Sequence, residues 1–279
     1  MSSIAATTPL LKAAFPVRRM DFSFADTHKY WWSGDPFMSL FMNNLSSLFP
    51  HGEKFFVDSV RAVRDQVKDP QLQKDISAFI GQEAMHSKEH QTYNDYALAH
   101  GIDLHTLDMR IKVSMGFISK YASKKFCLAV TCCLEHFTAI MAEQLLRRED
   151  ISMQMADPRM YKLWLWHAIE ENEHKSVAYD AYQAIGGGYL MRSATMLLVS
   201  ILFLNTITWH QLELLIKDRQ VFNWKSWKYG LKILFGLRDG YLTGLIGPWL
   251  EFFRPGFHPA QQDTRALENR WRMRLGFDR

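Results

Sequence analysis

Only three of the 279 residues are cysteines, Cys127, Cys132 and Cys133, and all three fall within one apolar segment. An odd number of thiols in one segment argues against a disulfide framework and favours a reducing compartment. The N-terminus lacks the basic start and the long apolar core of a secretory signal peptide. We therefore expect a cytoplasmic protein.

Several functional classes lack their usual signals in this sequence. The net charge is only +4, and no basic run is dense enough to predict binding to nucleic acid. There is no glycine-rich phosphate loop and no pattern of a Ser-His-Asp nucleophile. We therefore expect neither a nucleic-acid partner nor nucleophilic catalysis by a serine.

The sequence also lacks sustained alternation of apolar and polar residues, which is the signature of strands. Hydrophobic residues make up 48% and charged residues 22%, as in a globular protein. The apolar residues recur instead at helical spacing. The sequence therefore predicts an all-α fold.

Three of the expected helices share one start signal, the dipeptide Asp-Pro. An aspartate accepts hydrogen bonds from the first backbone N–H groups of a helix, and proline is tolerated at the first helical position. The dipeptides are Asp35-Pro36, Asp69-Pro70 and Asp157-Pro158. We expect helices over 36–49 with a break at 49–52, 53–67, 70–100, 103–148 with a bend near Ser123, and 158–185.

The predicted organisation has three parts: an irregular segment over 1–34, a helical body over 35–186, and an apolar helical extension over 187–279 that packs on the body. Residues 193–212 contain no Asp, Glu, Lys or Arg. Such a run fits a helix that is buried or lies on a membrane surface, a transmembrane span, or a subunit interface. The arginine-rich tail after Phe257 is expected to be a solvated helix, with an anionic membrane surface as the alternative.

The strongest chemical signal lies in residues 164–176. His167, Glu171 and His174 are spaced i, i+4 and i+7, which places them on one stripe of a helix. Glu83 and His86 occur earlier, each 88 positions before Glu171 and His174. In both helices the Glu lies thirteen residues and the His sixteen residues after the proline of the Asp-Pro start. Two Glu-x-x-His motifs at the same depth predict half of a paired metal site.

Two further carboxylates complete a dinuclear site of the kind held by four helices. Glu53 precedes the apolar pair Phe55-Phe56, and Glu135 is the one acidic residue in an apolar stretch. A carboxylate among core residues is costly unless it is paired or bound to a metal. Carboxylates and imidazoles together suit iron or manganese.

Residues 36–186 resemble the ferritin-like di-iron carboxylate superfamily, with its four-helix bundle. Residues 49–56, 82–90 and 170–175 are similar to a bacterial family labelled predicted metal-dependent hydrolases. His167 has no counterpart in the first half, where Phe79 stands at the equivalent position. The order His167, Glu171, His174 is similar to that of di-iron arylamine N-oxygenases, in which an extra histidine binds one iron.

The resemblance implies two iron ions, with manganese as an alternative, bound by four Glu and three His. The predicted metal ligands are Glu53, Glu83, His86, Glu135, His167, Glu171 and His174, and the four glutamates are also the predicted catalytic residues. His90 is an alternative to His167 as the seventh ligand. Glu170 is a candidate for orienting one of the ligating imidazoles.

The leading functional hypothesis is an oxygenase or oxidase that activates O₂ at the two metals and acts on an apolar or amphipathic small molecule. It requires an electron donor. The alternatives are a hydrolase that uses metal-activated water and a metal-binding protein without enzymatic activity. A homodimer, contact with a membrane surface through the C-terminal helices and a location peripheral to the inner membrane are further expectations.

Overall fold

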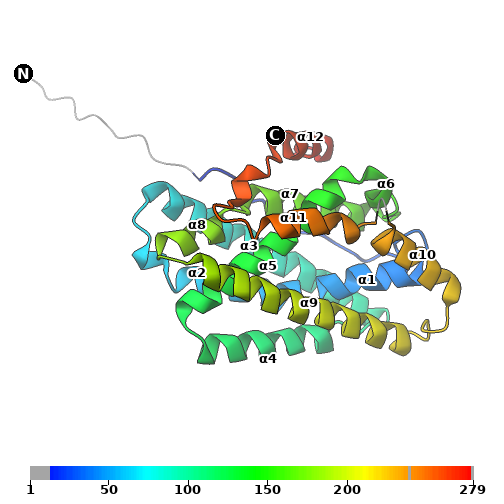
Figure 1. Cartoon of the computed structure of the whole chain (residues 1–279). Coiled ribbons are helices and arrows are strands. Elements are labelled where there is room, and N and C mark those ends of the chain that lie inside the picture. Colours follow the sequence, from blue (N-terminus) through cyan, green and yellow to red (C-terminus); the bar gives the residue numbers. More distant parts are fainter. Residues whose placement is uncertain (1–12, 238–239, 278–279) are drawn as a thin grey trace, which may run out of the picture.

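A computed structural model describes residues 13–237 and 240–277 of the chain. These residues form α-helices and short 3₁₀ turns, with one isolated bridge between Trp32 and Met155 and no strands, so the predicted all-α class is confirmed. The α-helices shown in Figure 1 are α1 (Pro36–Ser46), α2 (Phe49–Arg61), α3 (Pro70–Ala99), α4 (His105–Tyr121), α5 (Lys124–Arg147), α6 (Glu149–Ser152), α7 (Pro158–His174), α8 (Val177–Ala184), α9 (Tyr189–Lys217), α10 (Trp224–Phe235), α11 (Ile246–Glu251) and α12 (Arg265–Leu275).

The three Asp-Pro signals start helices as predicted. Asp35 accepts a hydrogen bond from the backbone N–H of Met38 at the start of α1. Asp69 and Asp157 each accept two backbone N–H bonds at the starts of α3 and α7. These caps fix where α3 and α7 begin, and thereby the heights of the two Glu-x-x-His motifs that the helices carry.

Helices α2, α3, α5 and α7 surround a common interior. Helix α2 contacts both α3 and α5, and α7 contacts the same two helices, so the four close into a ring of neighbours. Helix α4 packs against α2, and α9 packs against α1 and α5 (Figure 1). The side chains that the ring directs inward are therefore buried.

Two boundaries differ from the sequence prediction. Residues 49–52 do not break a helix but begin α2, because Pro50 occupies one of the first two helical positions, where its missing N–H is not needed. The single helix predicted over 158–185 is divided at Lys175 and Ser176 into α7 and α8. The half-buried Lys175 ammonium donates to Thr264 Oγ1 and to the Gln262 carbonyl, so a partner distant in sequence stabilises the interruption.

The segment before α1 contains no helix over residues 13–34 and lies on the helical body, while residues 1–12 of the predicted irregular segment lie outside the described residues. It buries Phe15, Phe24, Trp31 and Trp32. It also delivers Arg18, whose guanidinium donates to Glu170 at 2.9 Å and to Glu173 at 2.8 Å. The segment therefore contributes charge beside α7 as well as apolar contacts.

The arginine-rich tail forms α12, which packs on α7. The indole of Trp271 is buried and donates to the Leu146 carbonyl. Arg272 pairs with Glu173 at 2.7 Å, and Arg274 pairs with Glu149 at 2.8 Å. These two arginines are directed to carboxylates of the body, so the alternative in which the tail binds an anionic membrane is not favoured.

Helices α5 and α9 are both long and apolar enough to cross a membrane. Helix α5 lies in the interior, with most of its apolar 18-residue stretch buried. In contrast, only 33% of the apolar 18-residue stretch of α9 is buried. Contacts hold α9 to the body along its length: Ile207 O accepts from Asn44, and Gln211 donates to Phe37 O. Helix α9 therefore lies along the body with one face buried and one face exposed.

Candidate metal centre

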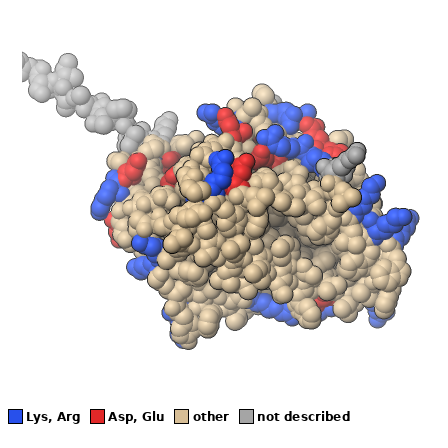
Figure 2. Space-filling view, in the orientation of Figure 1, with Lys and Arg blue, Asp and Glu red and all other residues tan. Residues whose placement is uncertain are grey.

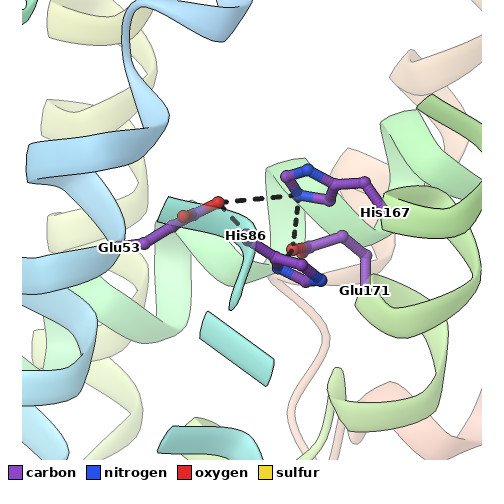
Figure 3. A group of neighbouring side chains, drawn as sticks. All are labelled: Glu53, His86, His167 and Glu171. Carbon is purple, nitrogen blue, oxygen red and sulfur yellow. Dashed lines mark hydrogen bonds and ion pairs between the residues drawn. The ribbon is translucent and has the colours of Figure 1, made fainter. Parts of the chain in front are cut away.

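One group of donor atoms joins α2, α3 and α7. Figure 3 shows the side chains of Glu53, His86, His167 and Glu171 converging on one point. His167 Nε2 lies 2.9 Å from Glu171 Oε1 and 3.7 Å from Glu53 Oε1. His86 Nδ1 lies 3.5 Å from the same Glu171 oxygen and 3.9 Å from Glu53 Oε1. All four residues are buried, and one ligand atom from each lies within 4.8 Å of the others, so the group could hold a metal ion.

A second group adjoins the first and shares Glu171 with it. It consists of Glu83, Glu171 and His174, all of them buried. His174 Nε2 lies 3.1 Å from Glu83 Oε1 and 3.7 Å from Glu171 Oε1. Glu135 of α5 reaches the same nitrogen, with its Oε2 at 3.5 Å. The structure thus brings all seven predicted ligands together as two adjacent groups, with Glu171 common to both.

Eight buried donor atoms of these groups lack hydrogen-bond partners within the described part of the chain. The atoms without a partner are Glu53 Oε1, both oxygens of Glu83, both oxygens of Glu135, Glu171 Oε2, His86 Nδ1 and His174 Nε2. A buried polar group without a partner costs about 1–3 kcal/mol, and more if it is charged. Bound cations would satisfy carboxylate oxygens and imidazole nitrogens arranged in this way. The donor set therefore fits metal ions.

The residue before each motif glutamate orients the histidine of the other motif. His86 Nε2–H donates to Glu170 Oε2 at 3.0 Å, which leaves Nδ1 directed at the first group. His174 Nδ1–H donates to Gln82 Oε1 at 2.8 Å, which leaves Nε2 directed at the second group. Gln82 and Glu170 are themselves 88 residues apart, like Glu83 and Glu171. The predicted orienting role of Glu170 thus has a counterpart in Gln82, which the sequence analysis did not identify although the same offset points to it.

A chain of four side chains runs outward from His167. His167 Nδ1 lies 2.7 Å from His90 Nε2, and His90 Nδ1 lies 2.9 Å from Ser46 Oγ. Ser46 Oγ–H donates to Asn94 Oδ1 at 2.8 Å, and the Asn94 amide orientation is fixed by its donation to the Ser46 carbonyl. Ser46 must then accept from His90 Nδ1–H, and with a metal ion on His167 Nε2 the neutral His90 would accept from His167 Nδ1–H.

In the metal-free protein His167 Nε2 is hydrogen-bonded to Glu171 Oε1 at 2.9 Å, and a metal ion bound to Nε2 would replace the proton that joins these two atoms. His90 lies behind His167, outside both groups. The geometry therefore favours His167, and not the alternative His90, as the seventh donor.

Burial and mutual repulsion shape the pKa values of the centre. Burial raises the pKa values of Glu53, Glu83 and Glu135, and the charge of Glu83 adds to the effect on Glu53 and Glu135. For Glu171, burial acts in the same direction, but His174, His167 and His86 outweigh it and hold its pKa well below the usual value.

The pKa values of the three histidines are likewise shifted in different directions. Burial would lower the pKa values of His86 and His174, but neighbouring carboxylates outweigh burial and hold both pKa values well above 6.5. Hydrogen bonds to Glu170 and Glu171 act on His86, and the charge of Glu171 and hydrogen bonds to Glu171 and Glu83 act on His174. Burial and the neighbouring His86 lower the pKa of His167 to about 4. In the metal-free protein, protons on His86 and His174 therefore supply part of the positive charge that balances the carboxylates. Metal binding would displace these protons.

A cavity of about 330 Å³ leads to the first group. Glu53, His167 and Glu171 lie at its inner end, and the rest of its wall is almost entirely apolar, including Phe56, Leu134 and Phe137. Its outer part lies between α4 and α9, where Ser114, Met115, Leu198 and Leu202 are among the lining residues. Sequence reasoning did not predict this cavity, because it is formed by residues of α1, α2, α4, α5, α7 and α9, which are distant in the sequence.

A comparison with protein-family models finds a match over residues 16–263 to a family described as predicted metal-dependent hydrolase. No curated protein and no solved structure matches the chain. The description agrees with the hydrolytic alternative of the sequence analysis rather than with its leading hypothesis of O₂ activation. The ferritin-like resemblance stays a prediction.

Proposed function

The chain belongs to the family of predicted metal-dependent hydrolases, and we propose that it is an enzyme that holds two metal ions within the ring of α2, α3, α5 and α7. The observation that carries the proposal is the set of seven buried Glu and His donors, eight of whose atoms have no hydrogen-bond partner within the described residues. One ion would be held by Glu53, His86, His167 and Glu171. The other would be held by Glu83, Glu135, Glu171 and His174, with Glu171 as the shared ligand.

We propose a ferritin-like arrangement for this centre, because two Glu-x-x-His motifs and two single glutamates from four helices are the donor set of that superfamily. The chain supplies a shell of its own around the donors. Glu170 and Gln82 hold His86 and His174 in fixed orientations, and Arg18 in turn holds Glu170. Partners of this kind fix the tautomer and ring orientation of a ligating imidazole.

We propose oxidation of an apolar or amphipathic substrate with O₂ as the reaction. Two iron ions with a carboxylate-rich shell would supply O₂ reduction, with electrons from a separate donor. The ligand set supports this choice: four carboxylates balance two multiply charged cations and can change their binding mode with metal valence. The apolar wall of the cavity excludes water from the metal edge, which favours oxidation over competing hydrolysis.

Metal-dependent hydrolysis is the second candidate, and the family description favours it. In that reaction, metal ions lower the pKa of a bound water so that it attacks an ester or amide. The cavity would bind the apolar part of such a substrate, with its reacting bond at Glu53 and His167. Both candidates share the centre and the cavity, and they differ in the co-reactant.

A single experiment separates the two candidates. The iron-loaded protein is reduced and mixed with O₂, and O₂ consumption and visible absorbance are followed. We expect rapid O₂ uptake and a transient absorption band, neither of which occurs in protein stripped of metal. Hydrolysis of an apolar ester under argon, with no O₂ uptake in air, would instead establish the hydrolase. An anomalous map without metal near Glu83 and Glu171 would refute both.

Replacement of His167 by alanine tests whether this histidine, which has no counterpart in α3, is a metal ligand. The first group would keep Glu53, His86 and Glu171, so we expect the variant to retain metal but to show an altered visible spectrum on mixing with O₂. Metal content per chain and the O₂ reaction are measured together. The control is His136→Ala, because His136 is equally buried but contacts the Pro248 carbonyl outside both groups. An unchanged spectrum would show that His167 is not a ligand.

A further inference from the structure

The outward face of α9 is apolar and carries no charge over most of its length. Its side chains with more than half of their surface exposed include Leu190, Leu197, Ile201, Leu202 and Trp209. Between 193 and 212 the helix contains no Asp, Glu, Lys or Arg. Contiguous exposed apolar surface of this kind marks an interaction site in a folded protein.

Helix α4 extends this apolar surface. Met109, Val113, Phe117 and Tyr121 recur every four residues, so they form one stripe, and they are 47–69% exposed. Helices α4 and α9 both line the outer part of the cavity, through Met115 and Ile118 on α4 and Leu198 and Leu202 on α9. We call the exposed surface of α4, α9 and α10 the apolar face. The cavity opens onto it.

Cationic side chains accompany the apolar residues on this face. Helix α10 exposes Lys225, Lys228 and Lys232 next to Trp224 and Phe235, the composition of a helix that lies at a membrane surface. Besides the buried Arg192, α4, α9 and α10 contain seven Lys or Arg, all exposed, but only two acidic residues, Asp108 and Glu213. Figure 2 shows a broad uncharged surface, hollowed within, with basic residues along its lower and right edges.

The two acidic residues are not available to a basic partner. Asp108 is buried, and Glu213 pairs with Arg110 and, at 2.9 Å, with Lys217. A second copy joined by a twofold axis would place this face against itself, and the face offers the α10 lysines no free carboxylate. Anionic lipid headgroups offer the missing charge, and acyl chains match the apolar residues.

We propose that the apolar face docks on an anionic lipid bilayer without crossing it, so that the cavity opens into the lipid and takes up an acyl chain from it. The contacts of α9 with α1 and α5 keep the helix parallel to the body, so it lies in the interface plane. The docking is independent of the proposed reaction. The identification of the substrate as a membrane lipid rests on the proposed function.

Docking is tested by flotation of the full-length protein with vesicles of phosphatidylcholine, with and without phosphatidylglycerol. We expect binding to the anionic vesicles that weakens as salt increases. The double variant Ile201→Glu/Trp209→Glu should lose this binding by at least about ten-fold, because both side chains are exposed and would have to bury a charge. The matched control is Met153→Glu, a 71% exposed position that is not on the apolar face.

The contribution of the α10 lysines to vesicle binding is tested by the triple variant Lys225→Gln/Lys228→Gln/Lys232→Gln. Each Lys near an anionic surface contributes about 1 kcal/mol, so the variant should bind the anionic vesicles on the order of 100-fold more weakly at low salt. Parent protein that does not float with anionic vesicles would overturn the proposal. So would a stable dimer, seen by light scattering, that Ile201→Glu/Trp209→Glu converts to a monomer, because the face would then join two copies.

The acyl-chain site is tested with a fluorescent fatty acid titrated into the protein without vesicles. Leu198→Asn/Leu202→Asn makes the cavity mouth polar and should weaken binding several-fold, whereas Leu190→Asn/Leu197→Asn changes exposed residues of the same helix that do not line the cavity. Equal binding by both variants would exclude the cavity as the site. Metal-stripped protein should still dock on vesicles, so a failed metal centre and a failed docking surface give different results.

Discussion

Replacement of Glu171 by alanine should abolish the binding of both metal ions. Glu171 is the one residue common to the two donor groups, and its Oε1 lies within 3.7 Å of His86 Nδ1, His167 Nε2 and His174 Nε2. Its loss removes a ligand from both ions and takes away a carboxylate that lies beside three imidazoles. We expect affinity to fall by at least about 100-fold, more than the loss of an outer partner causes. Metal analysis after dialysis measures the effect.

The control for this variant is Glu143→Ala. Glu143 also lies on a helix of the ring, α5, but pairs with Arg147 at the surface and contacts neither donor group. It should bind as much metal as the parent. A Glu171→Ala protein that retains two metals per chain would show that Glu171 is not the shared ligand.

Metal should stabilise the protein more strongly at high pH than at low pH. In the metal-free protein, the raised pKa values of Glu53, Glu83 and Glu135, and of His86 and His174, all act in one direction. Each contributes stability that is fully present below the ordinary value of the group, 4.5 for Glu and 6.5 for His, and is lost as pH rises through the raised value.

Glu171 is the exception, but its contribution to stability changes only at a pH below the range from 5.5 to 8. Its pKa is depressed, so its contribution is present above 4.5 and is lost only as pH falls further. Raising the pH from 5.5 to 8 therefore destabilises the metal-free protein at this centre. Metal binds the deprotonated ligands, so its affinity rises over the same range.

The measurement is thermal unfolding of metal-loaded and metal-stripped protein across this pH range. At a metal concentration about 1,000-fold above Kd the stabilisation is about 4 kcal/mol, which corresponds to a rise in Tm of about 10 °C. We expect this difference at pH 8 and a smaller one at pH 5.5. Glu171→Ala should show no difference at either pH, and a difference that narrows with rising pH would contradict the pKa shifts.

The helices could be predicted from the sequence where one local signal decides them. Asp69 and Asp157 cap α3 and α7 through their own side chains, so both helix starts were predicted correctly. Ser123 similarly caps α5 at the expected bend. The break between α7 and α8 could not be predicted in this way, because the interactions of Lys175 are with residues 262 and 264, nearly 90 positions later.

The sequence by itself determined which residues form the candidate centre. Caps and periodicity set the depth of Glu83, His86, Glu171 and His174, because helix geometry converts a count of residues into a height. The isolation of Glu135 in an apolar stretch indicated the third helix. Such arguments work because each depends on a residue and its neighbours along one helix.

Only the tertiary structure decided how these residues are used. It showed that Gln82 and Glu170 each orient the histidine of the other helix, and that His90 supports His167 from outside both groups. It also decided that α9 exposes the face beside which the cavity opens. The orientation and burial of side chains, and the cavities between them, depend on side chains from different helices that meet in the fold. The spacing of residues along one helix carries no information about which other helix they will face.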